Sequence, residues 1–201
     1  MTDSFRTLRD RSIGLCKDRG SKFIAYAQRV DHLADVASFQ ESVKAEHPKA
    51  RHHCYAYRIG LTGDTFREND DGEPSGTAGK PIMGQIQSFG LTNVMVIVVR
   101  YFGGKLLGAS GLIKAYKGAA ADALEQSVII EDTVKSYFTV TSSFGALHEV
   151  LPLLKQDGVV LLSEDYSVEP IFTLGVRMSE ASALQDKLEA IDGVSTATKR
   201  K

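Results

Sequence analysis

The first two thirds of the chain alternate between strand-like and helix-like spacing of hydrophobic positions. Apolar residues alternate with others in residues 21–30, which indicates a strand, whereas residues 93–101 are apolar almost throughout and indicate a central strand buried on both faces. Between such segments, apolar residues recur three or four positions apart, as in an amphipathic helix. We expect Asp31 to cap the first helix. The pattern predicts strands over 21–30, 53–59, 65–68 and 93–101 and helices over 32–46, 81–90 and 110–126.

The last third of the chain has its own series of strand-like and helix-like hydrophobic patterns. Glu131 and Asp132 interrupt the apolar pattern, and a second series of elements follows. The pattern there predicts strands over 133–141, 158–166, 170–177 and 194–198 and helices over 147–156 and 179–189. The order βαββαβ is typical of a ferredoxin-like fold. The sequence therefore predicts an α+β protein of two domains, residues 1–130 and residues 131–201.

Composition indicates a soluble protein of a reducing compartment. The longest apolar run, Val94–Val99, is far too short to cross a bilayer. Residues 1–11 carry charges of both signs and no apolar block, which argues against a secretory signal. Cys16 and Cys54 lie far apart and form no paired-cysteine motif, so no disulfide framework is indicated. We expect a cytoplasmic location and no membrane partner.

Charge is distributed unevenly along the chain. Residues 1–130 hold 17 Lys and Arg against 14 Asp and Glu, a net +3, whereas residues 131–201 hold 7 against 11, a net −4. No acidic residue occurs between Glu73 and Asp122. That stretch could focus a positive potential on which an anion docks, or its cations could scatter over ordinary solvated surface. Its cations are Lys80, Arg100, Lys105, Lys114 and Lys117.

Residues 70–81 are the densest group of polar residues and glycines. They do not match the phosphate loop of nucleotide hydrolases, because Pro74 replaces its first glycine and Pro81 replaces the hydroxyl residue after its lysine. Backbone N–H groups of a glycine-rich turn before a helix can still hold an anion. The side chains expected to assist are Ser75, Thr77 and Lys80. The alternative is a turn whose glycines serve backbone geometry alone.

Two other groups look like metal or catalytic clusters but lack the required spacing. The carboxylates in residues 70–73 suit a hard cation, yet the calcium-loop spacing is absent. Adjacent His52 and His53 point to opposite faces of a strand and cannot share one ion. Nothing marks Cys54 as an activated nucleophile. We expect no metal, no cofactor and no catalytic residue.

Residues 100–111 form the most distinctive stretch. A buried strand ends in a charge, then aromatic residues, glycines and the start of a helix, a junction that presents N–H groups at a sheet edge. Lys114 and Lys117 share one face of that helix. Such a set suits a phosphate backbone and a stacked base, although a tight turn and a solvated helix face would look the same. The expected binding residues are Arg100, Tyr101, Gly103, Gly104, Lys105, Ser110, Lys114 and Lys117.

Four motifs between residues 21 and 125 resemble those of the YigZ/Impact family in order and spacing. They are residues 21–23, 46–54, 70–81 and 99–116. The resemblance implies a first domain with the fold of the second domain of ribosomal protein S5. It also implies a ferredoxin-like second domain similar to a late domain of elongation factor G. Eukaryotic members regulate translation initiation, and bacterial members have been suggested to bind nucleic acid. The resemblance supplies no catalytic residues.

Three functional hypotheses follow. The leading one is a non-enzymatic factor that binds nucleic acid or the ribosome through the basic first domain, with the acidic second domain contacting a protein. A second is an enzyme that acts on a small anionic substrate. Its acid–base groups would come from His52, His53, Asp71, Glu73, Lys80 and Arg100. A third is a protein-interaction module whose glycine loops are architectural. The acid-free basic stretch favours the first.

Overall fold

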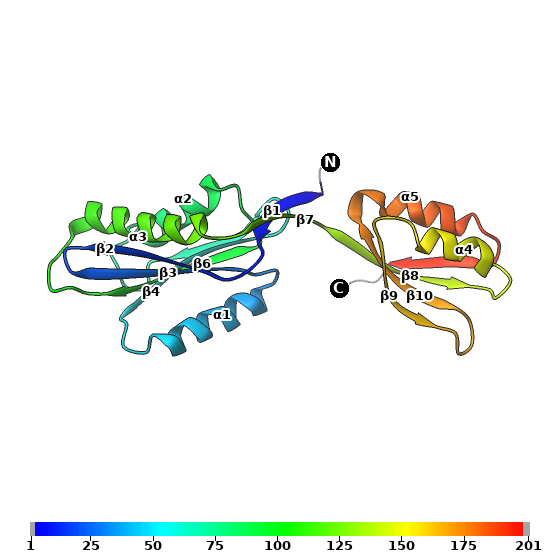
Figure 1. Ribbon diagram of the computed structural model, residues 1–201, viewed down its shortest axis with the longest axis horizontal. Coiled ribbons are helices and arrows are strands. Elements are labelled where there is room, and N and C mark those ends of the chain that lie inside the picture. Colours follow the sequence, from blue (N-terminus) through cyan, green and yellow to red (C-terminus); the bar gives the residue numbers. More distant parts are fainter. Residues whose placement is uncertain (1–2, 199–201) are drawn as a thin grey trace. The chain divides into compact units, whose positions relative to one another are not determined.

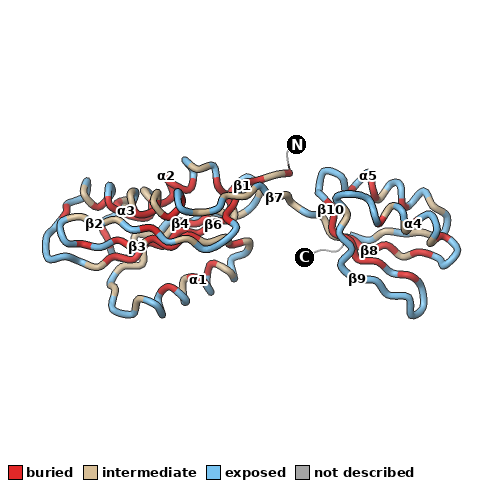
Figure 2. The backbone as a smooth tube through the Cα atoms, viewed as in Figure 1, coloured by how far each residue is buried: buried red, intermediate tan, exposed pale blue. Residues whose placement is uncertain are grey.

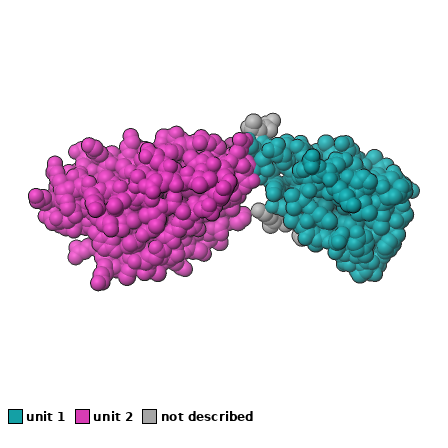
Figure 3. Space-filling model, viewed as in Figure 1, with its two compact units in different colours: residues 1–4, 133–201 teal, residues 5–132 magenta. Residues whose placement is uncertain are grey.

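The structure, a computed structural model, describes residues 3–198 and separates into two compact units (Figure 3). The N-terminal unit comprises residues 5–132, and the C-terminal unit comprises residues 133–198 together with Asp3 and Ser4. The sequence pattern placed the division at 130/131 and did not predict that the start of the chain would join the second unit. It does so because the Asp3 carboxylate accepts hydrogen bonds from the backbone N–H of Ser179 at 3.1 Å and from its hydroxyl at 2.6 Å.

The N-terminal unit is built on a five-stranded antiparallel sheet in the order β2-β3-β6-β4-β5. Helix α1 (Leu33–Glu46) covers one face, and α2 (Gly79–Ser88) and α3 (Gly108–Glu125) cover the other (Figure 1). Because the central strand is covered on both sides, it is buried along nearly its whole length (Figure 2). The strands are β2 (Ser12–Asp18), β3 (Ser21–Arg29), β4 (His52–Ile59), β5 (Thr65–Asn69) and β6 (Val94–Tyr101).

Alternate residues of the strands enter two separate cores. Val98 of β6 packs in the core that contains Tyr116 of α3, whereas Ile97 packs in the core beneath α1. Because side chains alternate along a strand, Arg100 lies on the α2/α3 face of the sheet and Tyr101 on the α1 face. The two neighbouring residues thus leave β6 on opposite sides, although both line one pocket at the end of the strand.

Three strands were not predicted: β1 (Ser4–Leu8), β2 and β7 (Ile129–Thr133), of which β1 and β7 pair as a two-stranded sheet. The physical reason is clearest in β2. Its inward positions are Gly14 and Cys16, while Ile13 is 53% exposed and Leu15 is 43% exposed. Gly14 faces α3 so closely that no side chain fits, which removes the apolar alternation that marks a half-buried strand.

Helices α1, α2 and α3 begin at positions other than those predicted. Asp31 does not cap α1; instead Asp35, in the first turn, accepts the N–H groups of Asp31 at 2.9 Å and His32 at 2.8 Å. Helices α2 and α3 each start two residues earlier than expected, at Gly79 and Gly108.

Within residues 3–198, no helix has both the length and the apolar character needed to span a membrane.

The C-terminal unit is a four-stranded antiparallel sheet in the order β11-β8-β10-β9, with two helices packed against one core. Strands β8 and β10 lie in the centre, so the spatial order is that of a ferredoxin-like βαββαβ fold and confirms the predicted α+β class. The elements are β8 (Lys135–Ser142), α4 (Leu147–Leu154), β9 (Val159–Asp165), β10 (Ile171–Arg177), α5 (Met178–Glu189) and β11 (Val194–Thr198).

The close approach of β2 to α3 predicts a stability effect at Gly14. A Cβ at this position would lie 2.2 Å from the backbone nitrogen of Ala123, so Gly14→Ala should lower the free energy of unfolding by about 1–3 kcal/mol, as measured by urea denaturation. The matched control is Gly84→Ala in α2, where nothing lies within 4 Å of the new methyl group and helix propensity should raise stability by about 0.5–1 kcal/mol. Equal effects of the two substitutions would contradict the packing described for β2.

Candidate functional site

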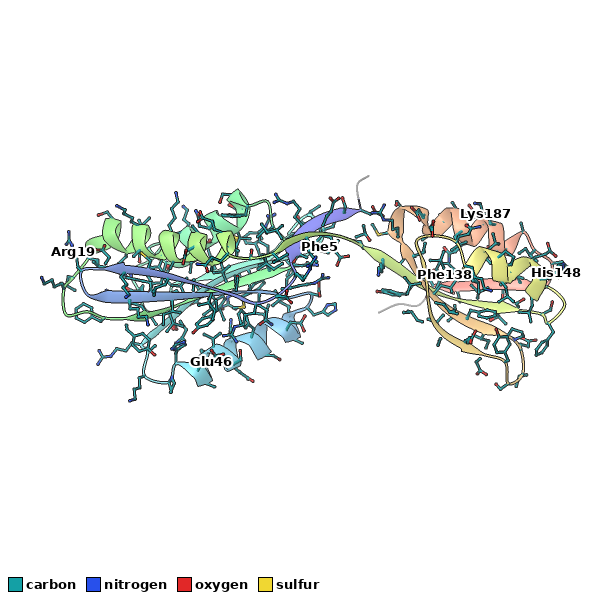
Figure 4. All side chains as sticks on the ribbon, viewed as in Figure 1. Phe5, Arg19, Glu46, Phe138, His148 and Lys187 are labelled. Atoms are coloured by element: carbon teal, nitrogen blue, oxygen red, sulfur yellow. The ribbon has the colours of Figure 1, made fainter. Side chains whose placement is uncertain are left out.

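A pocket of ≈ 470 Å³ opens at the end of the N-terminal sheet where the neighbouring strands β4 and β6 begin and end, respectively. The chain leaves α1 at Glu46 (Figure 4) and reaches β4 through residues 47–51. Strands β4 and β6 are antiparallel with His52 opposite Arg100, so the segment before β4 and the segment after β6 meet at one edge. The residues that line the pocket are Lys49, Arg51, His52, Arg100, Tyr101, Phe102 and Leu106.

Among residues 3–198, the groups that line this pocket are cationic, aromatic or aliphatic, and none of them is a carboxylate. Lys49 and Arg51 are both exposed to solvent. Other pockets differ in charge, since those beside α1 and α5 contain Asp31 with Asp35 and Asp157 with Glu180 respectively. A concave site with one sign of charge concentrates the potential that attracts an anion.

Arg100, which lines the pocket, is held from behind by a buried ion pair. Arg100 Nη1 donates a hydrogen bond to Glu73 Oε1 at 2.6 Å, and the Tyr116 hydroxyl donates to the same oxygen at 2.8 Å. The side chains of Arg100 and Glu73 are only 8% and 4% exposed. Burial, together with the neighbouring Cys54 and Glu73, raises the pKa of Tyr116, which keeps this hydroxyl a donor. Arg100 was expected to be an open phosphate contact, but its charge is largely satisfied by Glu73.

Asp70 occupies the anion-binding turn that the sequence suggested before α2. Its carboxylate accepts the backbone N–H groups of Gly76 at 2.8 Å, Ala78 at 2.9 Å and Gly79 at 2.8 Å. Burial alone would raise the pKa of Asp70, but these three hydrogen bonds outweigh it and lower the pKa below its usual value. The N–H groups expected to hold an external anion therefore already hold an internal one.

The side chains expected to assist at that turn have other roles. The Thr77 hydroxyl donates to the carbonyl of Pro74 at 2.6 Å and is buried. Ser75 and Lys80 are exposed, and neither lines the pocket. The turn is thus held by its own contacts, which is the architectural alternative considered from the sequence.

The histidine and cysteine cluster at the start of β4 is tied to the same loop. His52 Nδ1 bonds the carbonyl of Asp71 at 2.8 Å, and the backbone N–H of His53 donates to the Asp71 carboxylate at 2.6 Å. The Cys54 thiol donates to the carbonyl of Asp70 at 3.0 Å, and burial raises its pKa to about 12, so it is a packed group and not a nucleophile. Across residues 3–198, no group of three His, Cys, Asp or Glu side chains is placed to hold a metal ion.

The aromatic and glycine residues after β6 are positioned by backbone contacts and one histidine. Tyr101 on the α1 face shares a hydrogen bond of 2.9 Å with Nδ1 of His47, which anchors its ring beside the pocket. A Cβ on Gly103 would lie 1.9 Å from the carbonyl carbon of Gly20, so this glycine permits the loop to pack on the β2–β3 turn. Gly104 has φ +84°, a left-handed conformation that favours glycine.

The remaining predicted cations do not line the pocket. Lys114 and Lys117 are exposed on α3, and both lie on the side of the helix away from buried residues such as Tyr116. Ser110 is exposed as well, and Lys105 is exposed next to the pocket residue Leu106. The expected patch is therefore divided. Arg100 is buried in the pocket lining, Lys105 lies next to the pocket, and Lys114 and Lys117 lie on the outer face of α3.

Sequence reasoning missed two cations that do line the pocket, Lys49 and Arg51. They precede β4 and lie outside the acid-free stretch, and only the pairing of β4 with β6 brings them next to Arg100. The available signal was the run from Arg51 to His53, which drew attention as a possible ligand cluster and not as the rim of an anion site.

Comparisons with known proteins agree with the motifs. The family model described as "Impact N-terminal domain" matches residues 19–124. The "IMPACT family member YigZ" of Escherichia coli is 36% identical over 170 residues, which cover 84% of this chain and 83% of that protein. The "IMPACT family member YvyE" of Bacillus subtilis is 32% identical over 166 residues, 83% of this chain and 76% of that protein. A solved structure described as "Crystal structure of an hypothetical protein" is 30% identical, covers 100% of both chains and has a TM-score of 0.76.

The three hydrogen bonds to Asp70 predict a pH-dependent stability effect. Asp70→Asn should lower the free energy of unfolding by about 2 kcal/mol at neutral pH, because it removes the charge that the N–H groups bind. Since the folded-state pKa lies below the ordinary value of 3.8, the contribution is complete above that pH and is lost as the pH falls through the folded-state value. Urea denaturation at several pH values measures the difference from the unmodified protein, which should shrink in acid.

The control for that series is Asp10→Asn, which removes an exposed carboxylate from the same unit and should change stability by less than about 0.5 kcal/mol. If the difference in the free energy of unfolding between Asp70→Asn and the unmodified protein stays constant into strong acid, the charge of the Asp70 carboxylate does not stabilise the loop.

Proposed function

Because this chain belongs to the Impact family and its N-terminal unit carries a basic pocket, we propose that it is a non-enzymatic RNA-binding factor that associates with the ribosome and is linked to the regulation of translation. The observation that carries this proposal is the composition of the pocket, where Lys49, Arg51 and Arg100 lie with Tyr101 and Phe102. The ribosome is an RNA-rich partner, and the family resemblance connects this fold with translation.

Cations next to exposed aromatic rings are the combination that single-stranded RNA requires. Lysine and arginine contact phosphate and fix the position of the chain, while unstacked bases pack on aromatic side chains. Lys49 and Arg51 supply exposed charge, and Phe102 keeps 58% of its surface in solvent. A pocket that binds only a small inorganic anion would not need an exposed aromatic ring.

The two carboxylates that could perform acid–base catalysis, Asp71 and Glu73, are engaged in the structure. Glu73 accepts from Arg100 and Tyr116, and Asp71 holds the backbone of β4 at His53. These contacts favour binding over an enzyme acting on a small anionic substrate. We assign protein contacts to the C-terminal unit, because residues 131–201 carry 11 Asp and Glu against 7 Lys and Arg and would repel phosphate.

Charge reversal at the pocket should weaken RNA binding and its salt dependence. For Lys49→Glu with Arg51→Glu, we expect affinity for a labelled single-stranded RNA to fall about tenfold or more at low salt, measured by fluorescence anisotropy. The slope of log affinity against log salt should fall by about 1–2, since two phosphate contacts are lost. In co-sedimentation with ribosomes, the double variant should be released at a lower salt concentration than the unmodified chain.

The matched control is Lys114→Glu with Lys117→Glu, which changes the net charge of the same unit equally but lies outside the pocket. It should reduce affinity less than the pocket variant and leave the salt slope nearly unchanged. Equal losses in the two variants would show that overall charge, and not the pocket, governs binding. No loss in either would remove the RNA proposal and leave the protein-interaction module.

A further inference from the structure

The pocket has the size of a small-molecule site. Its volume of ≈ 470 Å³ lies within the range of about 300–1,000 Å³ that is typical of ligand pockets. Its exposed cations, Lys49 and Arg51, come from the segment that enters β4, while its aromatic and aliphatic groups and the ion-paired Arg100 come from the end of β6 and the segment that follows. A ligand that fills it must present an anionic part to one side and an apolar, planar part to the other.

The ring of Phe102 is placed to receive a planar group. The guanidinium carbon of Arg100 lies 5.5 Å from the centroid of Phe102, so one side of the ring is turned toward a fixed cation. The residue is nevertheless 58% exposed, which leaves the rest of its surface open. Arg100 cannot move away, because Glu73 holds its Nη1. A base stacked on Phe102 would continue a cation–ring stack that is already formed.

Arg100 also has an unused hydrogen-bond donor. The residue is 8% exposed, and its Nε is buried with no hydrogen-bond partner among the residues that the structure describes. Buried donors are nearly always paired, so this nitrogen calls for an ordered water behind the pocket wall. Because the atom itself is buried, a ligand in the pocket meets the guanidinium of Arg100 through Phe102 and not through Nε.

His52 adds an acceptor to the lining. Its Nδ1 lies 2.8 Å from the carbonyl oxygen of Asp71, and a carbonyl can only accept, so Nδ1 carries the proton of the neutral ring. The other ring nitrogen, Nε2, is then an acceptor. The ribose 2′-hydroxyl is a donor that RNA has and DNA lacks, and it is the group by which proteins distinguish them.

These features together give one ligand class. We propose that the pocket binds a single unstacked ribonucleotide of an RNA chain, with its base on Phe102, its phosphate between Lys49 and Arg51, and its 2′-hydroxyl at His52. The inference rests on the proposed function, since it names the part of the RNA that enters the site, and it adds a preference for ribose.

The experiment measures binding of mononucleotides to the full chain by isothermal titration calorimetry. The probes are the four ribonucleoside 5′-monophosphates, their 2′-deoxy analogues, their nucleosides and inorganic phosphate. At least one ribonucleotide should bind with one-to-one stoichiometry and more tightly than its nucleoside, its deoxy analogue and phosphate. Phe102→Ala should weaken it about 5- to 150-fold, the effect expected for loss of one stacked base.

The matched control is Phe66→Ala on β5, because Phe66 is 62% exposed in the same unit and does not line the pocket. It should leave nucleotide affinity unchanged, and since both rings are exposed, both variants should fold.

Three results overturn the inference. Phosphate binding as tightly as every nucleotide would reduce the pocket to an anion site. Equal affinity for ribo- and deoxyribonucleotides would remove the ribose contact. Failure of all the mononucleotides to bind, while Lys49→Glu with Arg51→Glu still weakens binding of the RNA oligomer, would reject the nucleotide pocket and leave the proposed function standing.

Discussion

The contact between Glu73 and Arg100 is the interaction on which the architecture of the site depends. It joins the loop before α2 to the end of β6, 27 residues apart, and Tyr116 of α3 donates to the same carboxylate oxygen. Both charges are almost completely buried, so each loses several kcal/mol of hydration, which only close geometry and additional hydrogen bonds can offset. The pair therefore fixes three elements relative to one another, and Arg100 in turn fixes the ring of Phe102.

The electrostatics of the pocket follow from how the nearby carboxylates are used. By sequence, residues 70–73 bring three acids close to the site, which would cancel its basic character. In the structure, Asp70 binds backbone N–H groups, Asp71 binds the N–H of His53, and Glu73 binds Arg100. Each carboxylate stabilises the loop or the sheet edge, so none lines the pocket. Lys49 and Arg51 are left to set the sign of its potential.

Sequence patterns identified the elements whose burial is regular. The uniformly apolar β6 and the series of elements in the C-terminal unit were recognised, because their inward positions carry large apolar residues. Strand β2 was not, because its inward position Gly14 touches the backbone of α3 and has no side chain to show a pattern. The stretch of residues 100–111 was recognised as a junction between a strand and a helix, as the end of β6 and the start of α3 confirm, but the segment that lies opposite it depends on the register of β4 with β6. That register is a tertiary property that local spacing does not contain.

A double-mutant cycle on Glu73 and Arg100 tests this account most directly. Urea denaturation of the unmodified chain, Glu73→Gln, Arg100→Met and the double variant gives the coupling free energy between the two side chains. Each single substitution leaves one buried charge unpaired and should cost about 3–5 kcal/mol, whereas the double variant should cost less than the sum by about 2 kcal/mol or more. Losses that add to within about 0.5 kcal/mol would show that the two residues act independently, and that the pair does not organise the site.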